Sequence, residues 1–136
     1  MFLANYSDGL SDLPLDRYIA DFEAKHAVAH LASVRARQSF HFATSTPEGT
    51  VTAIGPLGGD GLYINGGYFV FRSEIFDYVK EGEELVGRPF ERLIDKGLLT
   101  TTRHEGFWQP MDTFKDKIMY DRMASAGECP WMLWRR

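Results

Sequence analysis

Apolar residues occur in short runs separated by turn residues, which is the pattern of an α/β domain. Residues 2–6 form an apolar run that predicts a short buried strand, and Ser7-Asp8-Gly9 predicts a sharp turn after it. From Leu15 the apolar positions mostly follow helical spacing as far as Ala29, and residues 31–37 return to a strand pattern. This strand–turn–helix–strand order predicts a right-handed crossover and some parallel sheet.

The rest of the chain continues as short strands and helices. Ser73 is a plausible N-cap of one helix, and Gly97 and Gly127 are typical residues to end the two helices after it. We read residues 55–61, which include four glycines and Pro56, as a loop. The pattern predicts strands at 40–44, 51–54, 63–64, 68–71 and 98–103, and helices at 73–78, 89–96 and 113–126.

Composition limits the class of protein. The chain has 136 residues, 44% hydrophobic and 25% charged, so we expect one globular domain over residues 1–136. A formal net charge of −4, with Lys and Arg scattered, does not fit a nucleic-acid-binding surface. No apolar run approaches the length of a membrane helix, so we expect no membrane partner. A single cysteine, Cys129, suits a reducing cytoplasm, which is the location we expect.

Two aspartates stand at element boundaries. Asp8 follows the first predicted strand and precedes Gly9, and Asp112 precedes the last predicted helix. Ligands collect at the carboxyl ends of strands in open α/β sheets, and carboxylates are ligands that Mg²⁺ prefers. The alternatives stay open at this point: Asp8 is also typical of a turn, and Asp112 of a helix cap.

The histidines and aromatic residues support plainer interpretations. His26 and His30 lie four apart on the first predicted helix, but no third zinc ligand is evident, so we expect them to be exposed. We interpret His104 as an exposed partner of Glu105. The aromatic residues near the C-terminus are expected to pack that segment rather than to stack on a ligand; they are Phe107, Trp108, Trp131 and Trp134.

The segments FLANYSDGLSD (2–12), INGGYFV (64–70) and GFWQPMDT (106–113) together resemble the sugar-phosphate nucleotidyltransferases, most closely the glucose-1-phosphate cytidylyltransferases. Residues 2–12, FLANYSDGLSD, resemble the segment that supplies the first metal aspartate of that family. Residues 64–70, INGGYFV, resemble the sugar-contacting strand, and residues 106–113, GFWQPMDT, the segment with the second metal aspartate. Residues 75–78, 89–93 and 130–131 also match, in order and with similar spacing along nearly the whole chain.

The resemblance implies a fold and a site. The fold is α/β, a partial Rossmann-like nucleotidyltransferase fold with a mixed sheet and flanking helices, lacking the N-terminal nucleotide-binding half. Asp8 and Asp112 are the implied ligands of Mg²⁺, and no catalytic residue is expected apart from this metal site. The implied substrate-binding residues are Asn65, Gly66 and Gly67, and the implied reaction joins a sugar 1-phosphate to a nucleoside triphosphate and releases pyrophosphate.

The chain also departs from the family pattern. It has no glycine-rich phosphate loop followed by a lysine, and no Glu-Lys-Pro near Pro56. Ser39-Phe40-His41-Phe42 stands where the family often has Arg-aromatic-Gly, so His41 is a weaker candidate contact to the sugar phosphate. We therefore expect an incomplete catalyst, which meets a nucleoside triphosphate only if an N-terminal half is supplied. The alternative is a non-catalytic binding or assembly module, so the sequence leaves enzyme activity open.

A sheet without its N-terminal strands would leave an apolar edge beside residues 2–6. We therefore expect self-association or a partner chain.

Overall fold

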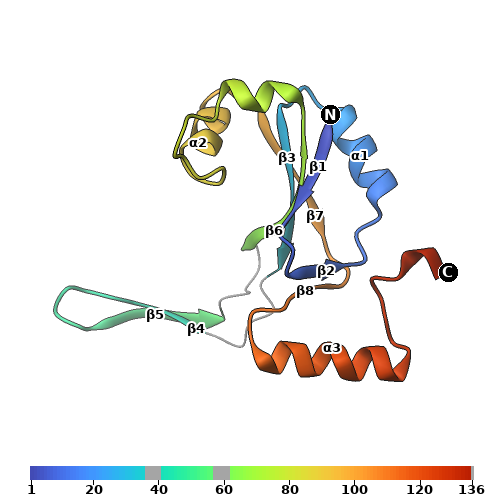
Figure 1. The fold of residues 1–136 in the computed structure, drawn as a ribbon. Coiled ribbons are helices and arrows are strands. Elements are labelled where there is room, and N and C mark those ends of the chain that lie inside the picture. Colours follow the sequence, from blue (N-terminus) through green and yellow to red (C-terminus); the bar gives the residue numbers. More distant parts are fainter. Residues whose placement is uncertain (36–40, 57–61, 136) are drawn as a thin grey trace.

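A computed structural model describes residues 1–35, 41–56 and 62–135 (Figure 1). The strands are β1 (Phe2–Asn5), β2 (Gly9–Ser11), β3 (Ala29–Arg35), β4 (His41–Ser45), β5 (Val51–Pro56), β6 (Tyr63–Phe71), β7 (Leu99–His104) and β8 (Trp108–Pro110). The helices are α1 (Leu15–Glu23), α2 (Arg88–Asp95) and α3 (Phe114–Ala126), with 3₁₀ turns η1 (Ser73–Asp77) and η2 (Leu133–Arg135). No helix in these ranges is long and apolar enough to cross a membrane.

Four strands form the main sheet, in the order β1-β6-β3-β7. The central strand β6 runs antiparallel to β1 and β3, whereas β3 and β7 are parallel. The sheet is therefore mixed, and the prediction of some parallel sheet is confirmed, although the parallel pair is β3–β7 and not the two strands of the opening strand–helix–strand unit. β1 lies at one edge, so the prediction that residues 2–6 adjoin an open edge is confirmed.

Helices α1 and α2 cover opposite faces of this sheet (Figure 1). Side chains alternate between faces along a strand, so Phe69 and Val70 of β6 point in opposite directions. Phe69 packs with Phe90 and Leu93 on the α2 face, and Val70 packs with Tyr18 and Phe22 on the α1 face. Tyr18 and Phe22 are four residues apart and share one side of α1, which explains why this short helix docks.

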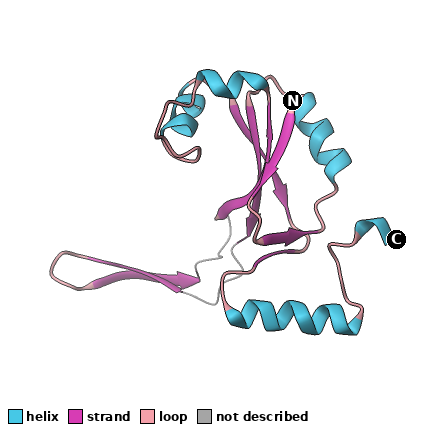
Figure 2. Ribbon diagram, viewed as in Figure 1, coloured by secondary structure: helices cyan, strands magenta, loops and turns pink. Residues whose placement is uncertain are grey.

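Two smaller antiparallel ribbons complete the structure. β2 pairs with β8, and β4 pairs with β5. Figure 2 shows the β4–β5 ribbon standing apart from the four-stranded sheet, while β2, β8 and α3 lie at the opposite end of the sheet from α2. The β2–β8 ribbon is the element that positions the candidate site.

Several sequence predictions need correction. The first helix ends at Glu23 rather than near Ala29, and His30 is a fully buried residue of β3, so it shares no helix face with His26. The segment at Ser73 is a 3₁₀ turn without a side-chain cap. β1 is present as predicted, but it is not buried: Leu3 is 48% exposed, and among the described strands β1 pairs only with β6.

Candidate functional site

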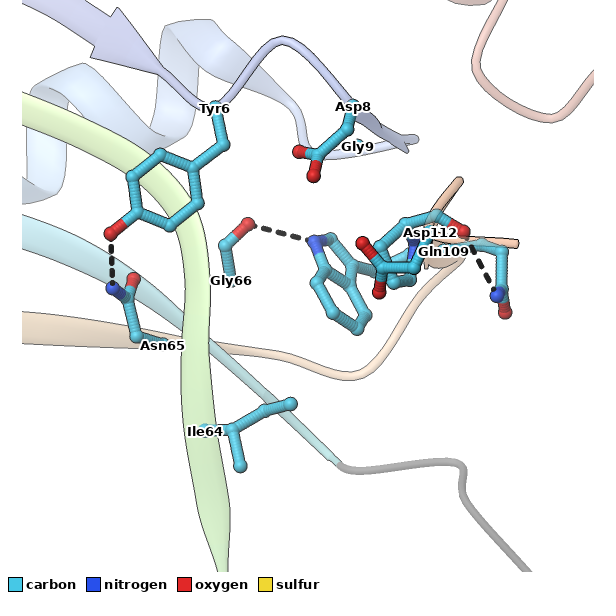
Figure 3. A pocket seen from close by; sticks show the side chains of 10 residues that line it. Tyr6, Asp8, Gly9, Ile64, Asn65, Gly66, Gln109 and Asp112 are labelled. Carbon is cyan, nitrogen blue, oxygen red and sulfur yellow. Dashed lines mark hydrogen bonds between the residues drawn. The ribbon is translucent and has the colours of Figure 1, made fainter. Parts of the chain in front are cut away.

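The β2–β8 ribbon brings Asp8 and Asp112 together from opposite ends of the chain. Gly9 of β2 pairs with Pro110 of β8. One residue beyond this pair, the Asp8 carbonyl accepts a hydrogen bond from the Met111 amide at 2.7 Å. The two aspartates therefore flank the same end of one ribbon, and both line a single cavity (Figure 3).

Neither the Asp8 nor the Asp112 carboxylate makes an interaction that stabilises the described part of the fold. Within the described ranges, neither the Asp8 nor the Asp112 side chain has a hydrogen bond or an ion pair, and both residues are exposed. Asp112 does not cap α3, because Thr113 is the N-cap and shares a capping box with Asp116. The cap alternative for Asp112 is therefore wrong. Asp8 does lie in a turn, but its carboxylate does not stabilise that turn.

The opposite wall of the cavity comes from β6. The indole Nε1 of Trp108 donates to the Gly66 carbonyl at 2.8 Å, which ties the β2–β8 ribbon to the sheet. Asn65 Nδ2 donates to the Tyr6 hydroxyl at 3.4 Å (Figure 3). The cavity has a volume of about 280 Å³, and its lining residues are Tyr6, Asp8, Gly9, Ile64, Asn65, Gly66, Trp108, Gln109, Pro110 and Asp112.

Gly67 lies behind this wall and is not one of the lining residues. Its φ of 71° is in the left-handed region, and its carbonyl accepts from the Tyr6 amide at 2.8 Å. Its own amide donates to Asn65 Oδ1 at 2.9 Å. The register of β6 against β3 shifts over this stretch, so residues 65–67 form a bulge that turns Asn65 toward the cavity.

The donor set suits a hard divalent metal ion. The described residues contain no group of three or more His, Cys, Asp or Glu side chains that could hold a metal. Two exposed carboxylates facing an open cavity fit Mg²⁺, which binds through one or two carboxylates and completes its shell with water and substrate phosphate. They do not fit a structural zinc site, which needs four protein ligands.

Neighbouring groups hold the β2–β8 ribbon in place. Tyr68 Oη donates to the Gly9 carbonyl at 2.8 Å, and the Tyr120 hydroxyl of α3 donates to the Gln109 carbonyl. Burial raises the pKa of both tyrosines, so these hydroxyls stay protonated and remain donors. Each strand of the ribbon is thereby anchored to a larger element.

No protein-family model matches the chain. Two glucose-1-phosphate cytidylyltransferases, from Salmonella typhi and Salmonella typhimurium, are each 32% identical to it over 135 residues. The match covers 98% of this chain and 52% of each relative. The predicted resemblance to sugar-phosphate nucleotidyltransferases is confirmed. The chain spans about half the length of the cytidylyltransferases it matches and corresponds to their C-terminal half.

The fold class is confirmed as well. A Bacillus anthracis structure, named for a glucose-1-phosphate thymidylyltransferase in complex with sucrose, superposes with a TM-score of 0.59 at 16% identity. The superposition covers 93% of this chain and 54% of that one. At this identity the likeness concerns the fold, a mixed α/β sheet with flanking helices.

The structure brings together four of the five predicted site residues, and Gly67 is the exception. The sequence interpretation missed Tyr6, Gln109 and Pro110 as cavity residues and assigned Trp108 to packing. All four lie inside the two segments that contain Asp8 and Asp112, so their closeness to these aspartates in sequence could have indicated that they line the same cavity. His41 lies on the separate β4–β5 ribbon and is not one of the lining residues of this cavity.

His104 is not the exposed partner of Glu105 that we predicted. Its Nε2 contacts Asp12 Oδ1 at 2.9 Å, and its side chain is only 10% exposed. Asp12 Oδ1 also accepts from the Phe107 amide at 2.7 Å. His104 and Asp12 therefore fix the turn that leads from β7 into β8.

The aromatic residues near the C-terminus divide into two roles. Trp131 packs against Phe107 and Tyr120, with ring centroids 5.6 and 5.3 Å apart, in agreement with the predicted packing role. Trp108 instead lines the cavity, and Trp134 is 74% exposed.

Proposed function

We propose that these 136 residues form the sugar-phosphate and metal side of a nucleotidyltransferase site. The reaction would join a nucleoside triphosphate to a sugar 1-phosphate, giving a nucleotide sugar and pyrophosphate, and glucose 1-phosphate is the first acceptor to test. The observation that supports this proposal is the pair of free carboxylates, Asp8 and Asp112, facing the Asn65–Gly66 wall across one cavity. The match to glucose-1-phosphate cytidylyltransferases supports the substrate class.

Each wall would have its own task. Asn65 would bind a sugar hydroxyl, because its side-chain amide offers both a donor and an acceptor. Gly66 has no side chain to obstruct a sugar, and a Cβ there would lie 3.0 Å from both the Ala32 carbonyl oxygen and Val34 Cγ1, so a larger residue would shift this wall. Asp8 and Asp112 would hold Mg²⁺, which when bound offsets the repulsion between two anionic substrates and orients them.

Little acid–base chemistry is required of the protein. The attacking phosphate oxygen of a sugar 1-phosphate is already ionised near neutral pH, so the site needs to position its substrates rather than to remove a proton. The 136 residues contain no glycine-rich loop followed by a lysine, so the triphosphate would be held by residues outside them.

Calorimetry on the 136-residue chain tests the proposal. Glucose 1-phosphate should bind with Mg²⁺ present and more weakly without it. Asp8→Asn and Asp112→Asn should each weaken the Mg²⁺-dependent binding at least tenfold, since each removes one of two anionic ligands. Asp95→Asn, at the exposed end of α2, is the matched control and should leave binding unchanged.

Two results would count against the proposal. If wild-type protein showed no Mg²⁺-dependent binding of glucose 1-phosphate, a non-catalytic module would be favoured. If both aspartate variants bound Mg²⁺ and sugar phosphate as the wild type does, the metal role of Asp8 and Asp112 would be wrong.

A further inference from the structure

A row of polar side chains crosses three strands of the sheet next to the candidate site. Ser33 of β3 pairs with Asn65 of β6 on one side and with Arg103 of β7 on the other. Residues directly opposite each other on neighbouring strands point to the same face. Asn65, Ser33 and Arg103 therefore form one line across that face. The line is about 10 Å long, because it spans two spacings between neighbouring strands.

This row opens into a second cavity that adjoins the first. The second cavity has a volume of about 440 Å³, and Asn65, Ser33, Arg103 and Tyr63 all line it. Asn65 lines both cavities. Asn65 and Ile64 are therefore the boundary that the two cavities share.

Arg103 is held in place without its hydrogen-bonding capacity being used. Its guanidinium carbon lies 4.8 Å from the centre of the Tyr63 ring. The Tyr63 hydroxyl donates to Glu105, and the carboxylate of Glu105 is also paired with Arg35 Nε at 2.9 Å. Tyr63 is thus a fixed platform, and the Arg103 side chain forms no hydrogen bond or ion pair with any residue in the described ranges.

The charge of this cluster favours an anion. Arg35 and Arg103 place two guanidinium groups around the Tyr63 ring, and the Arg103 side chain forms no ion pair with any described residue, so its positive charge is available to an anion. A guanidinium presents its N–H groups in a fork that matches the two oxygens of a carboxylate or phosphate. The row therefore offers an amide, a hydroxyl and an unpaired guanidinium in sequence.

We propose that the acceptor is a sugar 1-phosphate with a second anionic group, located at the end of the sugar remote from the reacting phosphate. Arg103 binds this second group. This inference rests on the proposed function. The reacting phosphate lies at the Asp8 and Asp112 end, Asn65 contacts the ring, and the remote anion reaches Arg103. The absence of a Glu-Lys-Pro near Pro56 is consistent with an acceptor that differs from glucose 1-phosphate. Arg103 would then determine specificity without touching the reacting atoms.

Calorimetry with three ligands, all in Mg²⁺, tests this assignment. Glucose 1,6-bisphosphate and glucuronic acid 1-phosphate should each bind about tenfold more tightly than glucose 1-phosphate, the gain expected from a charge-assisted hydrogen-bonded pair. The two anionic ligands distinguish a remote phosphate from a remote carboxylate. In the Arg103→Gln variant, the two anionic ligands should bind less than twofold more tightly than glucose 1-phosphate, and glucose 1-phosphate itself should bind as it does to the wild type. Arg88→Gln, at an exposed arginine of α2, is the matched control and should keep the full advantage.

The outcomes separate this inference from the proposed function. If glucose 1-phosphate binds in an Asp8-dependent manner but neither anionic ligand gains affinity, the Arg103 assignment is overturned and the proposed function stands. If the advantage persists in Arg103→Gln, Arg103 is not the contact. If no ligand binds the wild type in Mg²⁺, both proposals fail. A cooperative thermal unfolding transition shows whether each variant is folded, and a rise in its midpoint on ligand addition provides a second readout of binding.

Discussion

The contact between Gly67 and Tyr6 predicts a large and specific loss of stability on a small substitution. A Cβ added at Gly67 would lie 2.5 Å from Tyr6 Cδ2 and 2.9 Å from Tyr6 Cγ, well inside van der Waals contact. The backbone φ of Gly67 is 71°, a conformation that residues with a Cβ adopt at a cost. Gly67→Ala therefore combines a backbone penalty with a steric one.

The two penalties differ in size and can be separated. The left-handed backbone costs about 1–2 kcal/mol, and overlap in a packed region costs about 1–3 kcal/mol, so the free energy of unfolding should fall by about 2–5 kcal/mol. The Tyr6 ring is not free to move away at no cost. It packs edge-on against Phe69 at 5.5 Å, and its hydroxyl is hydrogen-bonded to Asn65.

Urea denaturation at neutral pH measures the effect, with Gly97→Ala as the matched control. Gly97 has a φ of 67° but no atom within 4 Å of the added Cβ, so this variant should lose only the backbone term. In a Tyr6→Ala background, Gly67→Ala should cost little more than Gly97→Ala, because the overlapping ring is gone and only the Cβ of residue 6, 3.2 Å from the added Cβ, remains.

Equal losses in Gly67→Ala and Gly97→Ala would refute the packing argument. So would a Gly67→Ala penalty that persists unchanged in the Tyr6→Ala background. Either result would mean that Tyr6 does not lie over Gly67 in solution, and the Tyr6–Asn65 wall of the candidate site would then lose its support.

Two further predictions concern acid stability and the open sheet edge. Burial is the main cause that lowers the pKa of His30 from 6.5 to about 4, so the unfolded chain binds a proton that the folded protein excludes. Stability should therefore be complete above pH 6.5 and fall by about 2 kcal/mol from pH 7 to pH 5 in urea titrations, and a flat profile would contradict this. The edge strand β1 should promote self-association, so the mass in sedimentation equilibrium should rise with concentration and Leu3→Lys should reduce it; a concentration-independent monomer would contradict this.

The elements that the sequence predicted well are those with local signals. Helices α2 and α3 end next to Gly97 and Gly127, both of which have positive φ, because glycine adopts the left-handed conformation that terminates a helix. Helix α1 ends at Glu23 with no glycine or proline beside it, and the apolar Ala27 and Val28 continue the pattern. The sequence pattern therefore predicted too long a helix, and His30 was assigned to that helix instead of to β3.

Local sequence patterns do not predict features that depend on the pairing of strands far apart in the chain. The segments 9–11 and 108–110 are three residues each and carry no periodicity, yet their pairing is what brings Asp8 and Asp112 together. The contact of His104 with Asp12 likewise joins residues 92 positions apart. The motif resemblance predicted the two aspartates, but only the register of the ribbon explains why they meet.

The bulge at residues 65–67 connects these observations. Without the positive φ of Gly67, the strand would keep its simple alternation, and Asn65 would lose the hydrogen bond to the Gly67 amide that orients it. With the bulge, one asparagine contacts the cavity of Asp8 and Asp112 and also begins the row that leads to Arg103. A change at Gly67 should therefore weaken the binding of glucose 1-phosphate and the preference for a second anion together, whereas Arg103→Gln should affect the preference alone.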